Sequence, residues 1–472
     1  MKSTFSLFLF LLLFIVETTA QDFPVTDVLV SASDAEIGDI EMDPYNNRIC
    51  WQSLDDHKLW ICHLDTSTWA LADPYGMEIL IDSSLTPLEQ TSNSGEWGFD
   101  MNFNYIVYNK LMYTNNISCS GKIRYIAVAT ETNLGWVKTI LYDAPHRINP
   151  HATRNPTDSV VAIHYIRLPF SVNTKYKFLD NPYDEHAVSW FKDAHWAADE
   201  QVMTGIIHDD QVALFNPLNP GIPLQLTNDP QLEYSVPFMW RAPEHDNARM
   251  FFARTNNTGI RVFKETSPNS NNYKIFTQFS SPSSNPLYNK IASPEPFVYQ
   301  GHSYITFMAS SSPHEIDYVP AEIWIVKLDS LDPVFRMVSD TSVSIRTDPE
   351  PFATSGKLLV YYTEILNPNA PDMISRIRKC ETGFGPGYIT AIKENVDITS
   401  NMYQVYPNPF HIHISLKNSK GKELYLLSGP SGQTIWKGRQ IENKDFSDLN
   451  PGLYFLKVIS EPSIHTIKMI KE

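Results

Sequence analysis

Long apolar stretches are almost absent from this sequence, and the clearest one opens the chain. Lys2 is followed by an apolar run from Phe5 to Val16 and by small residues up to Ala20. This run is shorter than the roughly 20 residues that a membrane span needs, and its order is typical of a secretory signal peptide. We therefore expect a signal peptide at residues 1–20, cleavage near Gln21, and no stable membrane span in the mature protein. An uncleaved anchor is the alternative.

Positive charge is scarce. The chain has 37 Lys and Arg against 53 Asp and Glu, which gives a formal net charge of -16 and an isoelectric point near 5.3. A nucleic-acid partner is not expected, because a basic surface is needed to neutralise phosphates. If the substrate is an anionic polymer, the site needs its own Arg, Lys or metal ion against this acidic background.

Cysteine is also scarce, with four residues in 472, too few for a disulfide scaffold. Cys50 and Cys62 fall opposite one another if residues 48–64 form a hairpin that turns near Asp56, so a disulfide between them is predicted. No Cys-x2-4-Cys pair occurs, and a zinc site built from cysteines is therefore not expected.

Several catalytic signatures are missing. The sequence has no Gly-x-Ser-x-Gly elbow, P-loop, His-Glu-x-x-His motif or dinucleotide fingerprint, so serine-hydrolase, NTPase and zincin functions have no local support. No long stretch repeats apolar residues at helical spacing. With 12% aromatic residues and 33 Pro, the composition favours many short strands joined by turns, and hence an all-β fold.

A strand-turn-strand unit recurs along most of the chain. Successive units start about 42 to 58 residues apart, the size of a four-stranded propeller blade, and the last two share Pro-Glu-Pro-Phe. The starts lie near Gly38, Glu96, Asn149, His195, Val236, Ser293 and Thr347. We predict a seven-bladed β-propeller over residues 21–382, closed by a strand at Thr26 to Ser33 that pairs with the last blade. Six or five blades, a β-helix and stacked sandwiches remain alternatives.

Two of these units, residues 46–71 and 209–229, resemble the repeats of TolB-like propellers. In both, an apolar strand is followed by a strand with a polar tip and a Thr-rich exit. The resemblance implies the repeat architecture and carries no activity with it.

The chain changes character after residue 382. Residues 383–402 are predicted to be a linker, and residues 403–472 form a Lys-rich β-module. Tyr406-Pro407-Asn408-Pro409, the segment from Gly452 to Phe455 and the closing Lys468 to Lys471 resemble the C-terminal type IX sorting domain of secreted Bacteroidetes proteins. This resemblance implies a small β-sandwich, the type IX secretion machinery as a partner, and a protein that is secreted or attached to the cell surface.

In a propeller, the starts of the innermost strands face the central channel. The strand positions predict that a shared funnel collects Asp39, Asp100, His151, His195, Tyr234, Glu295 and Glu350. Acids, His and Tyr are the residue types that general acid-base chemistry uses. A shift of one residue in any strand would turn its side chain away from the axis.

Glu295 and Glu350 occupy matched places in the two Pro-Glu-Pro-Phe copies, so they are candidates for a pair of glycosidase carboxylates. These segments look like the strand pattern of five-bladed glycosidases of the arabinanase and levansucrase kind, which Asp348, Pro349, Phe352, Gly356, Lys357, Tyr361 and Tyr362 match. The earlier copy departs from the pattern, since Ser293 stands where Asp is expected. Alternatively, each Glu only accepts hydrogen bonds from amides of its own blade.

The third unit is rich in groups that transfer protons or bind anions: His146, Arg147, His151, Arg154, His164, Tyr165 and Arg167. Removal of a proton next to a uronate carboxylate needs a base and a cation. The layout is similar to that of seven-bladed polysaccharide lyases of the ulvan lyase kind. Tyr234, with Arg249 or Arg254, would complete such a set. A purely structural role for these residues is the alternative.

A divalent metal ion, Ca, Mn or Zn, has candidate ligands in Asp184, Glu185, His186, Asp193 and His195. Their spacing is not diagnostic, and a solvated loop explains them equally. The aromatic side chains expected to stack on sugar rings are Trp97, Trp190, Trp196 and Trp240. In a propeller, Trp is also often wedged between blades.

The sequence thus predicts an exported, carbohydrate-active propeller. Elimination on a uronic-acid polymer is the first choice, with Arg147, Arg154, His195 and Trp97 as substrate-binding residues. Hydrolysis by the Glu pair and non-catalytic binding of glycan or protein are the alternatives.

Overall fold

The computed structural model divides the chain into two compact units, Met1–Tyr388 and Ile389–Glu472, each described separately below. The structure describes residues 25–384 and 404–471, apart from internal stretches at 54–56, 84–88, 114–121, 142–145, 168–172, 199, 329–332, 355, 369–372, 418, 420–422, 430–433 and 461–462. The predicted signal peptide and nearly all of the predicted linker lie outside the described residues. Among the described residues, no helix has the length and apolarity that a membrane crossing requires.

The described part of the first unit contains seven four-stranded antiparallel sheets, here called blades. Blade 1 comprises β2 (Ile37–Asp43), β3 (Arg48–Ser53), β4 (Leu59–His63) and β5 (Ile79–Asp82). Blade 2 comprises β6 (Glu89–Phe99), β7 (Asn104–Tyr113), β8 (Lys122–Thr132) and β9 (Gly135–Leu141). Blade 3 comprises β10 (Arg147–Ala152), β11 (Ala162–Arg167), β12 (Thr174–Phe178) and β13 (Asn181–Val188).

The remaining blades continue in chain order. Blade 4 comprises β14 (Lys192–Trp196), β15 (Met203–Ile206), β16 (Val212–Phe215) and β17 (Leu224–Gln225). Blade 5 comprises β18 (Tyr234–Ala242), β19 (Ala248–Thr255), β20 (Gly259–Glu265) and β21 (Tyr273–Ser280). Blade 6 comprises β22 (Lys290–Tyr299), β23 (His302–Ser310), β24 (Ala321–Lys327) and β25 (Val334–Met337). Blade 7 comprises β26 (Ile345–Ala353), β27 (Leu358–Leu366), β28 (Ile374–Glu381) and the N-terminal β1 (Thr26–Leu29).

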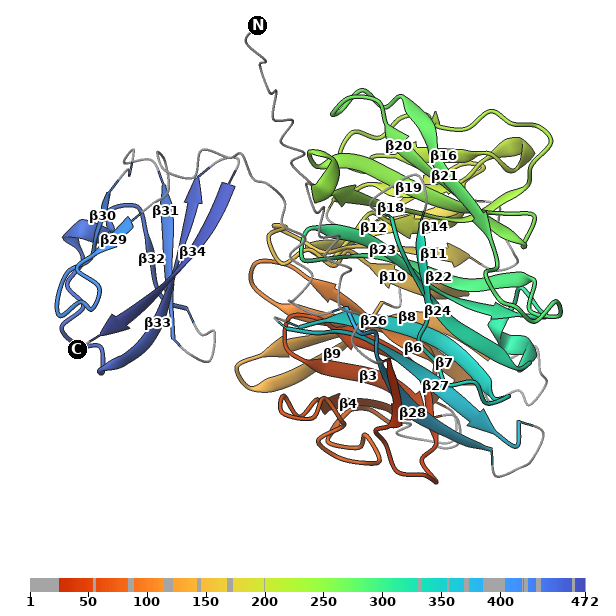
Figure 1. Cartoon of the computed structure of the whole chain (residues 1–472), viewed down its shortest axis with the longest axis horizontal. Coiled ribbons are helices and arrows are strands. Elements are labelled where there is room, and N and C mark those ends of the chain that lie inside the picture. The colour runs from red at the N-terminus through yellow and green to blue at the C-terminus, as the bar shows by residue number, and fades with distance from the viewer. Residues whose placement is uncertain are drawn as a thin grey trace, which may run out of the picture. The chain divides into compact units, whose positions relative to one another are not determined.

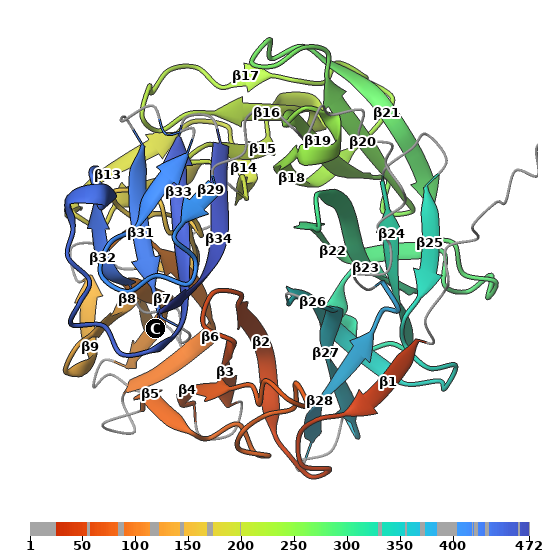
Figure 2. The same ribbon diagram turned by 60° about the vertical axis from the view of Figure 1, so that its left-hand side comes forward.

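The blades are arranged radially around a central space, with the first strand of each blade nearest the axis (Figures 1 and 2). The described residues of this unit also include the short 3-10 helices η2 (His208–Asp210), η3 (Pro243–His245) and η4 (Glu315–Asp317). The predicted all-β propeller is therefore confirmed.

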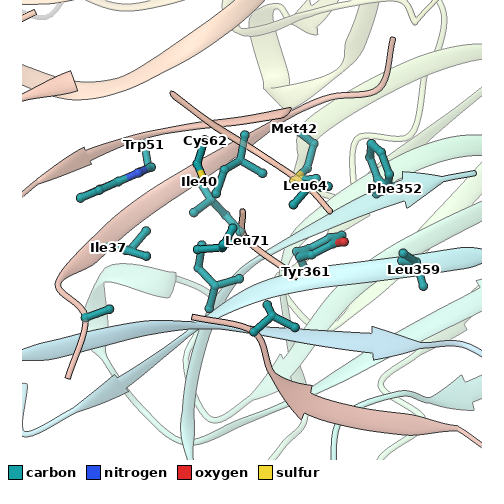
Figure 3. Close-up of a cluster of buried hydrophobic side chains, with 14 residues drawn as sticks. Ile37, Ile40, Met42, Trp51, Cys62, Leu64, Leu71, Phe352, Leu359 and Tyr361 are labelled. Carbon is teal, nitrogen blue, oxygen red and sulfur yellow. The ribbon is translucent and has the colours of Figure 1, made fainter. Parts of the chain in front are cut away.

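Each pair of neighbouring blades packs through its own cluster of buried apolar side chains. Figure 3 shows the cluster between blades 7 and 1, where Trp51 and Met42 pack with Leu359 and Tyr361. Corresponding clusters lie between the other neighbouring blades. Because strands alternate the direction of their side chains, both faces of a blade are apolar and each contacts a different neighbour. The core is thus a series of interfaces around the ring.

The N-terminal strand closes the ring. β1 pairs with β28, so that Asp27 lies opposite Cys380 in the ladder, as the sequence predicts. The buried Asp27 carboxylate accepts hydrogen bonds from Arg378 Nε at 2.8 Å, Tyr362 Oη at 2.8 Å and the backbone N–H of Asp340 at 2.7 Å. Closure occupies the outer edge of β28, which would otherwise expose unpaired backbone groups.

Every innermost strand of the described blades carries a β-bulge near its start, where the pairing with the second strand shifts. At six of these bulges a residue has a positive φ: Asp39, Asn149, Asp193, Val236, Ser293 and Asp348. Asp and Asn tolerate this left-handed conformation better than other non-glycine residues do. Because a bulge adds one residue to its strand, it changes which side chains face the channel.

The predicted disulfide between Cys50 and Cys62 is wrong, since both cysteines are free and buried. In the hairpin of β3 and β4, Cys50 lies opposite Ile61 and Cys62 lies opposite Ile49. The register is one residue away from the predicted one, and adjacent positions in a strand point to opposite faces. Cys50 therefore packs toward blade 2, while Cys62 packs toward blade 7.

The second unit has its own core. A two-stranded sheet of β29 (Gln404–Tyr406) and β30 (Ser415–Lys417) packs with a four-stranded sheet of β31 (Leu424–Ser428), β32 (Thr434–Gly438), β33 (Gly452–Ser460) and β34 (Ser463–Lys471), and with η6 (Ile441–Asn443). Phe410, Tyr425, Leu427, Leu456 and Met469 are buried between them.

Candidate functional site

A cavity of about 540 Å³ lies where the innermost strands of the propeller meet. This volume is in the range of small-ligand pockets. Strands β2, β6, β10, β14, β18, β22 and β26 all contribute lining residues, and η4 adds Glu315. The cavity therefore collects side chains from positions more than 300 residues apart in the sequence.

One repeated position supplies the most important side chains. Two residues after each positive-φ residue stand Glu41, His151, His195, Phe238, Glu295 and Glu350, and β6 supplies Glu96 directly after its register shift. All of these except Glu350 line the cavity. The bulges therefore place one side chain of each blade at equivalent positions around the axis.

The two sides of the cavity differ chemically. Blades 6, 7, 1 and 2 form an acidic side, which consists of Asp39, Glu41, Glu96, Glu295, Glu315, Asp348 and the buried Glu350. Blades 3, 4 and 5 form an aromatic side with His151, His195, Trp196, Phe238 and Trp240, and Tyr45 and Phe297 add aromatic rings from blades 1 and 6. Among the described residues that line the cavity, Arg154 is the only Arg or Lys. Carboxyl groups thus greatly outnumber positive charges.

Arg154 joins two of the carboxylates. Its Nη2 atom donates to Glu41 Oε2 at 2.6 Å and to Glu96 Oε2 at 2.7 Å. The other oxygen of Glu96 lies 3.1 Å from His151 Nδ1. Glu96 therefore has a positive or hydrogen-bonding partner at both oxygens.

Glu295 and Glu350 lack such direct contacts, although the charge of Arg154 acts on both. Within the described part of the chain, no hydrogen bond or ion pair reaches either carboxyl group, and Glu350 is only 2% exposed. The alternative in which each Glu is held by amides of its own blade is therefore not seen among the described residues.

These environments move the pKa values of the carboxyl groups in opposite directions. Burial raises the pKa of Glu96, but the positive charges of His151 and Arg154 outweigh burial and hold the pKa below its usual range. Burial raises the pKa of Glu295 to about 7, with the charge of Glu96 adding to the rise. Burial and then the charge of Glu295 raise the pKa of Glu350 well above its usual value. Near neutral pH, Glu96 is ionised while protons remain on its neighbours.

Three His rings lie together on the other side. His151 stacks on His164, with centroids 5.0 Å apart, and meets His195 edge to face at 6.0 Å. His195 in turn lies 4.0 Å from Phe238. Burial lowers the pKa of His195 to about 4, and burial with the charges of His151 and His195 holds the pKa of His164 well below its usual value. The His195 and His164 rings are therefore neutral, whereas Glu96 raises the pKa of His151 despite burial.

A second group of carboxyls lies on the acidic side. Asp348 Oδ2 accepts a hydrogen bond from the backbone N–H of Ile40 at 3.1 Å, and Glu315 accepts one from the Ser293 hydroxyl. Burial and the charge of Asp39 raise the pKa of Asp348, and the same two causes raise the pKa of Glu315 despite the Ser293 hydrogen bond. Asp39, Glu315 and Asp348 therefore repel one another within one part of the cavity.

Several residues predicted from the sequence come together in this cavity. Asp39, His151, Arg154, His195 and Glu295 line it. Glu350 lies beside it and interacts electrostatically with Glu295 and Arg154. His164 is 3% exposed and stacks behind His151 without lining the cavity.

Other predicted residues are placed elsewhere and serve the blades. Arg147 is buried, where it donates to Glu185 from Nε at 2.7 Å and lies over the Tyr165 ring. Arg254 donates to the backbone oxygens of Ile291 at 3.2 Å and Pro313 at 2.8 Å. His146, at the start of β10, is half-buried and not among the lining residues.

Tyr234, Asp100 and Trp97 are also outside the cavity. The Tyr234 hydroxyl accepts a hydrogen bond from Arg261 Nη1 at 2.9 Å. Asp100 caps a turn by accepting from the backbone N–H groups of Asn102 and Phe103. The structure contradicts the prediction that Trp97 stacks on a sugar, because Trp97 is fully buried between blades 1 and 2 and donates to the backbone oxygen of Glu41.

The sequence-based prediction missed Glu41, Glu96, Phe238 and Glu315. In three of the seven units it chose a residue two to four positions away: Asp39 for Glu41, Asp100 for Glu96 and Tyr234 for Phe238. In most blades, the residue that faces the cavity follows an Asp, Asn or Ser by two positions. This spacing is the signal that could have identified the missed residues. Glu315 comes from a loop outside the repeat and carries no such signal.

The predicted metal ligands do not assemble. Among the described residues, no group of three or more His, Cys, Asp and Glu side chains is placed to hold a metal ion. Glu185 pairs with Arg147, and His186 lies 3.4 Å from Asp184. Asp193 accepts a hydrogen bond from the backbone N–H of Val236 at 2.5 Å. Each of the three acids is therefore engaged separately.

Comparison with known families identifies the second unit. Residues 404–472 match the secretion system C-terminal sorting domain. This match confirms the type IX sorting domain that the sequence resembles, and it points to export by that machinery, with the protein secreted or attached to the cell surface. Among curated proteins, none matches the chain.

Three of the solved structures that resemble this chain, each at 10% sequence identity, illustrate the resemblance. The β-propeller domain of Cps50 (Swd1) from Myceliophteria thermophila gives a TM-score of 0.43 at 10% identity, covering 75% of this chain and 99% of that chain. The WD40 domain of SCAP from fission yeast gives 0.45 at 10% identity, covering 77% and 95%. Trypanosoma rangeli sialidase in complex with the inhibitor DANA gives 0.38 at 10% identity, covering 75% of this chain and 57% of that chain.

Proposed function

We propose that this protein is an exported carbohydrate-active propeller whose central cavity cleaves glycosidic bonds by acid-base chemistry. One observation carries the proposal: two carboxyl groups in one cavity have pKa values moved apart, with Glu96 ionised and Glu295 protonated up to a pH of about 7. A pair of this kind supplies an acid for the leaving oxygen and a carboxylate for the positive charge that develops on the sugar.

The surroundings of Glu295 suit an acid. The Glu295 carboxyl group lines the cavity and has no hydrogen-bond partner among the described residues, so its proton is available to a substrate. Phe238 and Trp196 also line the cavity and offer faces against which a sugar ring can stack. The cavity volume accommodates a short segment of a glycan.

Elimination on a uronic-acid polymer has weaker support. That reaction needs a cation to stabilise the charge that forms on the substrate carboxylate. In the part of the chain that the structure describes, Arg154 alone of the Arg and Lys residues lines the cavity, and two carboxylates already engage it. A uronate would also approach several like charges.

The test is a polysaccharide panel incubated with the purified chain. Hydrolysis releases reducing ends without the absorbance near 235 nm that marks the unsaturated product of a lyase. Glu295→Gln is expected to lower the rate by about 100-fold or more, while Glu233→Gln, an exposed site outside the cavity, leaves it unchanged. Reducing-end release that survives Glu295→Gln would overturn the assignment, as would absorbance at 235 nm. Retention on a glycan column with neither product would indicate binding alone.

A further inference from the structure

The imbalance of charge in the cavity restricts which glycans it accepts. The lining residues include six carboxyl groups and one Arg, and Glu350 adds a further carboxyl group beside them. A neutral sugar leaves this imbalance as it is, and an acidic sugar increases it. A ligand that brings a positive charge reduces it, and the gain is large because water is partly excluded.

The acidic side also contains a buried group that lacks a partner. Glu350 is 2% exposed, and no hydrogen bond or ion pair reaches its carboxyl group from the described part of the chain. Buried carboxyl groups are normally hydrogen-bonded or paired. Its electrostatic neighbours Glu295, Arg154 and Glu96 all line the cavity. Arg154 is the positive charge among them and is already paired with Glu41 and Glu96, so a cationic ligand bound there would bring Glu350 further positive charge.

A metal ion fits this arrangement poorly. No three of the described His, Cys, Asp and Glu side chains converge closely enough to hold one, and metal ions need ligand oxygens at about 2.0 to 2.6 Å. An ammonium group has three N–H donors that point in different directions and reach acceptors at about 2.8 Å. It can therefore be shared by carboxylates that stand apart.

The acceptors are already oriented. The Ile40 backbone N–H fixes one oxygen of Asp348, and the Ser293 hydroxyl holds Glu315. Asp39 lies close enough to both to raise their pKa values. The three carboxyls come from β2, η4 and β26, whereas His195 and Phe238 come from β14 and β18.

We infer that the cavity is selective for glycans that carry free amino groups, with the ammonium group held by Asp39, Glu315 and Asp348 while the sugar ring faces the aromatic side. This inference rests on the proposed function and names its substrate class, a glycan with unacetylated amino sugars.

The test uses calorimetry to measure the binding of three tetrasaccharides to the full chain. They are the tetramers of glucosamine, of N-acetylglucosamine and of galacturonate. The glucosamine oligomer is expected to bind at least about tenfold more tightly than the N-acetylated one. This difference in affinity should disappear at high salt. The difference in affinity between the glucosamine and galacturonate oligomers should be larger still. Glu315→Gln and Asp348→Asn should each remove most of the preference for glucosamine, measured as the ratio of the affinities for the glucosamine and N-acetylglucosamine oligomers. Glu233→Gln is the matched control.

Both cavity variants keep the oxygen that accepts the structural hydrogen bond, so the fold is expected to persist, and a thermal melt of each variant checks this. Equal affinity for the glucosamine and N-acetylglucosamine oligomers would overturn the inference, as would tighter binding of galacturonate. Hydrolysis of neutral glycans without a preference for amino sugars would refute the inference and leave the proposed function intact. Selective binding of the glucosamine oligomer without cleavage of any glycan would support the selectivity for amino sugars and refute the proposed function.

Discussion

At the scale of single residues, the main feature of the cavity is that it contains many carboxyl groups and few positive charges to stabilise them. Glu295 shows the effect most directly, because burial and the charge of Glu96 keep its proton on up to a pH of about 7. In an unfolded chain the same carboxyl ionises near pH 4.5. The folded state therefore binds this proton more tightly than the unfolded state does, and the stability associated with it is lost as the pH rises from about 4.5 to about 7.

This difference predicts the effect of Glu295→Gln on stability. Gln cannot ionise, so the variant should be more stable than the wild type at pH 8 by about 1 to 3 kcal/mol, since one pKa unit corresponds to about 1.4 kcal/mol. Near pH 5 the gain should be small. Thermal melts of both proteins across this range provide the measurement. An equal shift at pH 5 and pH 8 would mean that the Glu295 proton is not retained, and Glu233→Gln should show no shift at either pH.

Arg154 has the opposite role, because it compensates charge. Its Nη2 atom is shared by Glu41 and Glu96. Its charge lowers the pKa of both carboxyls against burial, which still raises the pKa of Glu41 well above its usual value. Arg154→Gln is expected to destabilise the protein at pH 7 by about 2 kcal/mol, less than for a fully buried pair because the side chain is 33% exposed. The loss should diminish at acid pH, where the carboxyls are protonated.

Arg241→Gln provides a matched control for the Arg154 measurement. Arg241 is 30% exposed and its Nε atom lies 2.9 Å from Glu200, a carboxylate that Arg249 also binds. Its removal leaves Glu200 with a partner, so a loss of only about 0.5 kcal/mol is expected. Equal losses for the two variants in denaturant melts would contradict the special role assigned to Arg154.

At the scale of strands, the bulges explain both what the sequence predicts and what it does not. The spacing of turns and apolar residues repeats from blade to blade, so the starts of the inner strands could be placed. The side chains facing the axis could not, because each bulge adds a residue and side chains alternate with a period of two. The predicted Asp39 is itself the bulge residue, two positions before Glu41, and the predicted Tyr234 precedes the bulge that comes before Phe238. His151 and Glu295 were predicted at their correct positions.

The bulge in β18 differs from the others, and this difference predicts a stabilising substitution. Val236 has a φ of 49°, whereas the equivalent residues in other blades are Asp, Asn or Ser. A β-branched side chain is strained there by roughly 1 to 2 kcal/mol. Val236→Asn should therefore raise the stability by about 1 kcal/mol and keep the backbone N–H that binds Asp193. Val298→Asn, another lining position without a positive φ, should not stabilise; a loss of stability in Val236→Asn would show that the strain is compensated.

At the scale of the whole molecule, the propeller and the sorting domain are two units, each stabilised by its own buried core. The blade interfaces stabilise the propeller, whereas the sorting domain has its own buried cluster around Leu427 and Leu456. The export signal could be predicted from its sequence because short ordered motifs mark it. The chemistry of the propeller could not, because its cavity is assembled from seven distant strands and one loop.

Because the two units have separate cores, we predict that a substitution in the sorting domain can abolish export while the propeller stays folded. Leu456 is fully buried, and Leu456→Asp places an unpaired charge in the small core, which a domain of this size cannot accommodate. In a host with the type IX machinery, this variant should accumulate in the periplasm, as measured by cell fractionation. Its propeller should melt at the wild-type temperature. Lys444→Ala, at an exposed loop of the same domain, should be exported normally. Normal export of Leu456→Asp would show that recognition needs the motifs alone, without the folded core.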